Sequence, residues 1–184
     1  SELEDLMRDV KRYADESARR IEEIIKRHRK LVREISKKIE ELIRELRKLI
    51  ERILELIRRD GDTEELKKEV EKIREEVEEM LERIKREVDK VKDENRRLDE
   101  KVRRDNERKK RDLERLLREL RDKVDEELLD RARKLIREIE ERSKELSKRN
   151  KEEVDRSEER IRRLLKRAEE ELRRVREELK EASR

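Results

Sequence analysis

The chain has no cysteine, no proline and no glutamine, a single glycine, and one tyrosine as its only aromatic residue. The lack of cysteine excludes disulfides, thiolate metal ligands and a thiol nucleophile. Disordered chains are rich in proline, glycine, serine and glutamine, so these absences argue against disorder. No apolar run approaches the ~20 residues that a membrane-spanning helix needs, and we therefore expect no membrane partner.

What the chain does contain is charge. Charged residues make up 63% of the sequence and hydrophobic residues 30%. The charged residues are mostly glutamate, lysine and arginine, which are strong helix formers, so long helices with a narrow apolar stripe are expected. The net charge is only +4, from 60 basic and 56 acidic residues, and it gives little reason to expect a nucleic-acid partner.

The apolar residues repeat every 18 positions in three parts of the chain. Examples are Leu3, Ile21 and Ile39, then Leu66, Ile84, Val102 and Leu120, then Leu128, Leu146, Leu164 and Ala182. Eighteen residues are five turns of an α-helix, whereas a heptad repeat forces a left-handed supercoil and an 11-residue repeat a right-handed one. The repeat therefore predicts nearly straight helices.

Helix ends can be placed from turn residues and from the phase of the stripe. Ser1 with Glu4 resembles a capping box at the start of the chain. Gly61 suits the position after a helix C-terminus, and Asp62 with Glu65 resembles a second capping box. Because short connections make successive helices antiparallel, this pattern indicates a bundle.

The second connection has no glycine. Beyond residue 125 the apolar stripe is displaced by about one residue, which is ~100° around a helix, and a break at 122–125 removes the conflict. The prediction is one all-α domain over residues 1–184, a straight antiparallel three-helix bundle with very long helices near 2–59, 63–122 and 126–183.

Six polar residues occupy positions that the repeat assigns to the core: His28, Asn95, Asn150, Ser17, Asn106 and Ser143. In antiparallel packing, facing residue numbers should sum to roughly 123 for the first two helices and about 247 for the last two. His28, Asn95 and Asn150 then share one level, and the other three share a second level ~16 Å away.

These coincidences predict two buried hydrogen-bond layers. An unpaired buried amide costs ~1–3 kcal/mol, so such layers would penalise slipped registers. The alternative is that the six residues lie at the edge of the stripe, partly in water.

The stretch 99–112 is weakly apolar, and Lys109 occupies the position of Ile73 and Val91 in the repeat. This stretch is either a soft or kinked section of helix, or one in which Lys109 extends past Tyr13 toward solvent.

In these features the sequence resembles computationally, parametrically designed helical bundles, in particular the straight, untwisted three-helix type with an 18-residue repeat. The resemblance covers the whole chain, and the polar core positions depart from it. It implies a hyperstable monomer made to test design principles, with no substrate and no cofactor. The start at Ser1 suggests a cleaved tag, although processing in a cell would look the same. Soluble production in the cytoplasm of a host is expected, and no native location is indicated.

Catalytic and metal-binding residues are not predicted. A di-iron bundle needs Glu-x-x-His motifs, but Ile25 and Leu31 flank the sole histidine, His28. His28 is expected to be a neutral core residue, and a pH switch is the alternative. The basic stretch 103–111 is interrupted by acidic residues and has no aromatic neighbour for base stacking, so we expect a solvated helix face.

The rival interpretation is a coiled-coil interaction or oligomerisation scaffold, designed or natural. Its basis is an apolar widening at Ile53, Leu54, Leu56 and Ile57. This group is either a contact patch or an end cap packed against Val124 and Leu128 or Leu129.

Overall fold

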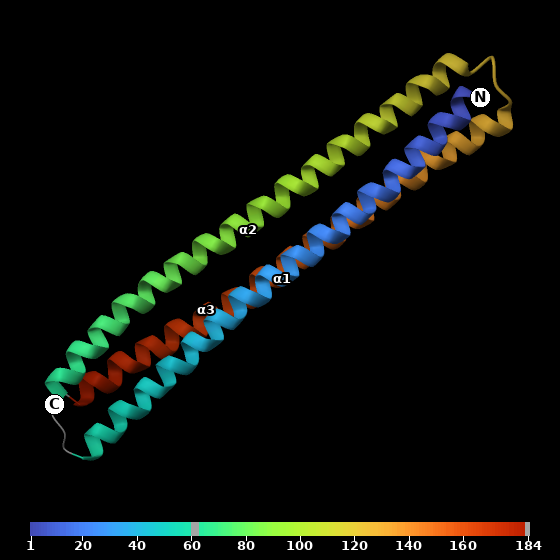
Figure 1. The fold of residues 1–184 in the computed structure, drawn as a ribbon. Helices are drawn as coiled ribbons and strands as arrows, with labels where there is room; N and C mark the ends of the chain where they lie inside the picture. The colour runs from blue at the N-terminus through green and yellow to red at the C-terminus, as the bar shows by residue number, and fades with distance from the viewer. Residues whose placement is uncertain (60–62, 183–184) are drawn as a thin grey trace. The chain divides into compact units, whose positions relative to one another are not determined.

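The computed structural model describes residues 1–59 and 63–182. These residues form three α-helices, which are α1 (Glu2–Arg58), α2 (Thr63–Leu120) and α3 (Glu126–Ala182) (Figure 1). They contain no strand. The predicted fold of three very long helices is confirmed; α2 ends two residues before the expected residue 122.

Local hydrogen bonds explain where the helices begin and end. The N–H of Glu4 donates to Oγ of Ser1 at 3.3 Å, as expected of a capping serine. After α2, the N–H of Lys123 donates to the carbonyl of Leu120 at 2.9 Å and forms a tight turn without glycine. The predicted roles of Gly61 and Asp62 lie outside the described residues.

The chain packs as two compact units, and each contains a segment of all three helices. Unit 1 comprises Ser1–Arg29 and Lys92–Asp155, and unit 2 comprises Lys30–Val91 and Arg156–Arg184. The single bundle over residues 1–184 stays a prediction.

Ion pairs show the helix directions within unit 1. Arg20 and Arg27 of α1 pair with Asp105 and Glu94 of α2, so residue numbers rise along one helix as they fall along the other. The antiparallel arrangement of α1 and α2 is therefore observed directly, close to the predicted register.

Unit 2 has one continuous apolar core, to which α1 contributes most. It is formed by Val32, Ile35, Ile39, Leu42, Ile43, Leu46, Leu49, Ile50, Ile53, Val70, Val77, Leu81, Ile84, Ile161, Leu164, Ala168, Leu172 and Val175. The buried positions recur at helical spacing on each element, as an amphipathic helix in a bundle requires.

Unit 1 has two smaller apolar clusters in place of one. The first is formed by Leu3, Val10, Leu113, Leu128, Leu129, Ala132, Ile136 and Ile139. The second is formed by Ala18, Ile21, Ile25, Val102 and Leu146. Buried polar residues occupy other core positions of this unit: Ser17, His28, Asn95, Asn106 and Asn150.

The proposed end cap of α1 is wrong. Ile53 is buried in the core of unit 2, and Leu54 and Leu56 pack against that core. Val124, Leu128 and Leu129 belong to the first cluster of unit 1. The reason is the antiparallel course of the chain, which brings the end of α1 to the start of α2.

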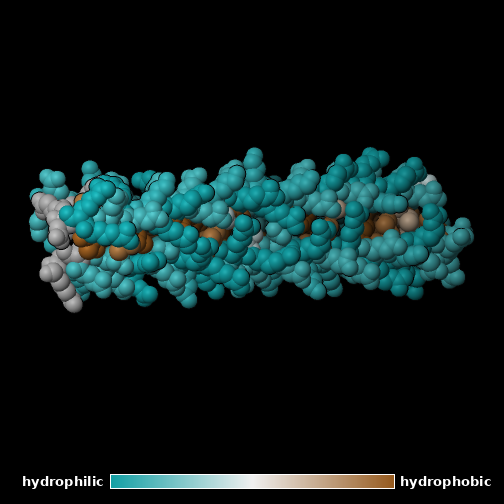
Figure 2. Space-filling model, turned by 90° about the horizontal axis from the view of Figure 1, so that it is seen from below, coloured by the Kyte–Doolittle hydropathy of each residue, from teal (hydrophilic) through white to brown (hydrophobic). Residues whose placement is uncertain are grey.

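Figure 2 shows a face covered mostly by hydrophilic residues, with apolar atoms visible only in small patches between them. The large apolar side chains that the described residues leave exposed are Ile57 (39%) and Met80 (43%). None of the helices, over the described residues, has an apolar stretch long enough to span a bilayer.

Candidate functional site: the polar core of unit 1

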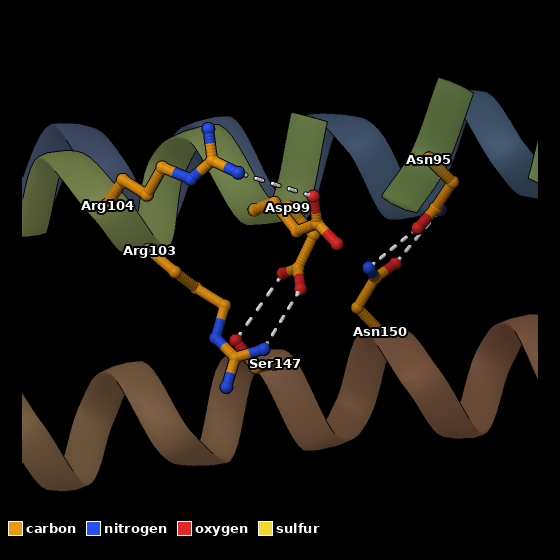
Figure 3. A network of polar contacts seen from close by, with 7 residues as sticks. Asn95, Asp99, Arg103, Arg104, Ser147 and Asn150 are labelled. Atoms are coloured by element: carbon orange, nitrogen blue, oxygen red, sulfur yellow. Dashed lines mark hydrogen bonds and ion pairs between the residues drawn. The ribbon is translucent and has the colours of Figure 1, made fainter. Parts of the chain in front are cut away.

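Asn95 of α2 and Asn150 of α3 form a reciprocal amide pair. Nδ2 of Asn95 donates to Oδ1 of Asn150 at 3.0 Å, and Nδ2 of Asn150 donates to Oδ1 of Asn95 at 2.7 Å (Figure 3). The two side chains point toward each other and are 5% and 3% exposed. Each amide therefore satisfies one donor and its acceptor inside the core, where an unmade hydrogen bond would be costly.

Asp99 extends this pair by one helical turn. Its carboxylate accepts a hydrogen bond from Oγ of Ser147 at 3.4 Å and lies 4.0 Å from the guanidinium of Arg103 (Figure 3). The side chain is only 13% exposed. Burial raises the pKa of Asp99, and the positive charge of Arg103 and the hydrogen bonds from Ser147 and Asn150 oppose that rise.

This contact between Asp99 and Ser147 was not predicted from the sequence. The 18-residue repeat holds the missing signal, because Asp99 stands between Leu81 and Leu117 in the same series. Ser147 likewise stands between Leu129 and Leu165. A charged residue in an otherwise leucine series is the pattern that could have revealed this contact.

His28 is buried, 5% exposed, and neither ring nitrogen makes a hydrogen bond with the described residues. Burial lowers the pKa of His28, and the negative charge of Glu153 offsets part of this effect. Burial therefore favours the neutral form of the ring. The structure shows no hydrogen bond from His28 to Asn95 or Asn150. Of the three residues predicted to share this level, only the two asparagines are hydrogen-bonded to each other.

An arginine–glutamate pair lies beside His28 in sequence. Nε and Nη2 of Arg29 donate to the two carboxylate oxygens of Glu153 at 2.8 and 3.1 Å, and Glu153 is 13% exposed. The same pairing recurs in unit 2, where Nε of Arg47 donates to Glu171 at 3.2 Å. Arg47 and Glu171 each lie 18 positions after Arg29 and Glu153, so these ion pairs follow the same repeat as the core.

Of the residues predicted to form the second level, Ser17, Asn106 and Ser143, only two line the same cavity. Asn106 and half-buried Ser143 line a cavity of about 320 Å³ between α2 and α3, with Lys110 and Glu140 paired on its wall. Ser17 is buried but does not line this cavity. Oγ of Ser17 and Oδ1 of Asn106 are buried without a hydrogen-bond partner among the described residues.

Half-buried Lys109 lies beside Tyr13, as one of the two alternatives expected, but its amine stays over the ring. Its Nζ lies 5.4 Å from the centre of the tyrosine ring, within the range of a cation–π interaction. Burial, and then the negative charge of Asp105, raise the pKa of Tyr13. The stretch 99–112 is helical throughout.

Basic residues of α2 in this stretch lie near carboxylates. Arg103 lies 4.0 Å from Asp99 and Arg104 lies 3.9 Å from Glu100 (Figure 3). These local pairs make the stretch a mixed-charge helix face. Within the part of the chain that the structure describes, no three acidic or histidine side chains come together as a group that could hold a metal ion.

Comparison with known proteins gives one kind of match. No protein-family model and no curated protein matches the sequence. A solved structure described as a "Computationally designed three helix bundle" is similar in fold, with a TM-score of 0.67 and 26% sequence identity, covering 99% of this chain and 93% of that chain. The chain therefore shares its three-helix bundle fold with a designed protein at low sequence identity.

Proposed function

We propose that this chain is a designed, hyperstable structural scaffold whose buried polar residues select one helix register, with no catalytic activity or cofactor. The similarity to a designed three-helix bundle supports a designed origin. The 18-residue repeat and the mixed-charge surface support it too, because regular patterning at every level is what design rules demand. We further propose that its helices are nearly straight, as that repeat favours.

The reciprocal pair of Asn95 and Asn150 carries the proposal for register selection. A helix that slides by one repeat, ~27 Å, would still align apolar stripes with each other. The repeat places Val77 and Leu113 in the series of Asn95, and Ala132 and Ala168 in the series of Asn150. In a slipped register each asparagine would face one of these apolar residues and lose its partner, which costs ~1–3 kcal/mol per buried amide.

The test replaces Asn95 and Asn150 with the apolar residues found at the corresponding positions of unit 2. The double variant Asn95→Val/Asn150→Ala copies the residues of Val77 and Ala168. Since the chain has no cysteine, spin labels can be attached at exposed Arg97 and Arg149 after substitution by cysteine. The parent protein should give one narrow distribution of distances between the two labels. The double variant should show a second distance as well, from molecules in which one helix has slid by one repeat.

Denaturation of the single and double variants provides the matched control. Asn95→Val alone leaves Asn150 unpaired and should lower the free energy of unfolding by ~1–3 kcal/mol, whereas the double variant should regain most of that loss. A double variant that keeps one distance, together with single variants of unchanged stability, would contradict register selection by this pair.

We also propose a monomer. Only two large apolar side chains, Ile57 and Met80, are exposed among the described residues, and a stable interface needs a broader apolar surface. Light scattering should therefore report 23.0 kDa, the mass of one chain. A concentration-independent mass of two or more chains would favour the oligomerisation scaffold instead.

A further inference from the structure

His28 occupies a core position that cannot easily accept a charge. Val10 and Leu46 hold the corresponding positions of the repeat, and both are buried. A neutral imidazole can stand there as a mostly apolar ring. A protonated ring carries two N–H donors and a full charge, whose burial without partners is strongly unfavourable.

The two asparagines predicted to share a level with His28 form hydrogen bonds with each other. Asn95 of α2 and Asn150 of α3 each use the side-chain oxygen and Nδ2 in their reciprocal pair. Asp99, one turn further along α2, accepts a hydrogen bond from Ser147 and forms an ion pair with Arg103. None of these hydrogen bonds includes a ring nitrogen of His28.

The charged groups around His28 are also engaged. On α1 its neighbours Arg27 and Arg29 are both cations, and Arg27 pairs with Glu94 of α2 at 2.9 Å. On α3, Glu153 is the carboxylate whose charge acts on His28, and Arg29 holds both of its oxygens. An imidazolium could gain Glu153 only by disturbing this bidentate pair.

We propose that unit 1 is an acid-responsive element. In this proposal, protonation of the buried His28, whose ring nitrogens have no hydrogen-bond partner among the described residues, opens the helix packing around it. Unit 2 has a continuous apolar core and no histidine, so it lacks this response.

The direction of the response follows from proton linkage. Burial lowers the pKa of His28, so an opened unit binds the proton more tightly than the closed one. The closed state is fully favoured above the ordinary pKa of histidine, about 6.5, and loses this advantage as the pH falls below it. Asp99 acts in the opposite direction, because burial raises its pKa and protonation removes a buried charge.

The experiment is hydrogen exchange at pH 7 and pH 5 in the Asp99→Asn background, with rates corrected for the intrinsic effect of pH. Peptides from residues 18–29 and 92–106 report on unit 1, and peptides from 32–50 and 70–84 report on unit 2. Opening of unit 1 should increase between pH 7 and pH 5, by at most about 25-fold if the opened state has the ordinary histidine pKa of about 6.5, while unit 2 stays unchanged.

The single histidine makes the trigger directly observable. One imidazole resonance should titrate by NMR with a midpoint below that of an exposed histidine, over the pH range in which exchange accelerates. His28→Leu should abolish the acid response, and it should fold because Leu46 fills the equivalent position in unit 2. His28→Gln, which keeps a buried polar group that cannot titrate, should abolish it as well.

An acid response that persists in His28→Gln would overturn the proposal. So would an imidazole that titrates at the ordinary histidine pKa without any change in exchange. Neither result would bear on register selection by Asn95 and Asn150, which is measured at constant pH.

Discussion

Units 1 and 2 share the same helices, the same repeat and an equivalent arginine–glutamate pair, yet their cores differ. Unit 2 joins its buried apolar residues into one cluster and also buries two serines, Ser36 and Ser157. Unit 1 divides its buried apolar residues into two clusters and also buries three asparagines, a histidine and a serine. Because the surrounding pattern is constant, the two units allow an internal comparison between a core with few buried polar groups and a core with more of them.

The largest expected effect is at the core of unit 2. Leu46→Ala removes a fully buried side chain and should lower the free energy of unfolding by ~2–5 kcal/mol, because the tightly packed cluster can collapse only partly around the cavity. Guanidinium unfolding measures the change, and His28→Leu at the same repeat position of unit 1 is the control, which should not destabilise. Comparable losses in the two variants would show that the cores are equivalent.

Transplanting the amide pair should give the next largest effect. Val77→Asn places an unpaired amide in the apolar core of unit 2 and should cost ~1–3 kcal/mol. Adding Ala168→Asn reproduces the geometry of Asn95 and Asn150 and should restore part of the loss, with a favourable coupling on the order of 1 kcal/mol. The coupling energy comes from a double-mutant cycle, and strict additivity would mean that the pairing depends on the surroundings in unit 1.

The gain from His28→Leu should depend on pH. Since burial lowers the pKa of His28, the parent loses stability as the pH falls below about 6.5, and the leucine variant does not. The difference in unfolding midpoint between the two proteins should therefore be larger at pH 5 than at pH 8. An equal difference at both values would show that His28 reaches solvent in the folded state.

The smallest effect should come from the shared ion pairs. Arg29→Ala and Arg47→Ala each remove a half-exposed arginine from a glutamate that is largely buried, and solvent and salt weaken the attraction on the arginine side. We expect both variants to unfold near the parent, with any difference vanishing in 1 M salt. A clear, salt-resistant loss for Arg29→Ala alone would show that its contact with Glu153 supports the polar core of unit 1.

Much of the fold could be read from local pattern. The helix starts at residues 2, 63 and 126 agree with those expected from caps and from the phase of the stripe. The C-terminus of α2 was placed two residues late, because a terminal turn closes with a hydrogen bond that leaves no composition signal. The end cap with Val124 failed because it ignored which helix ends an antiparallel chain brings together.

The candidate site was less accessible to sequence reasoning. Substitutions in the apolar series identified Asn95, Asn150 and His28 as core residues, and all three are buried. The hydrogen-bond partners were not predictable in the same way, because two side chains at one level meet only if their rotamers and the helix rotation allow it. Asn95 meets Asn150, whereas His28 meets neither.

The amino-acid sequence by itself determined the helices and the residues that face the core, because helix propensity and an 18-residue apolar period are local properties. Only the tertiary structure decided which buried polar groups are satisfied. It joined Asn95 to Asn150 and Asp99 to Ser147, and it left His28 and Ser17 without hydrogen-bond partners among the described residues. The physical reason is that a hydrogen bond requires approach to about 3 Å at a favourable angle, a condition that a position in a repeat does not specify.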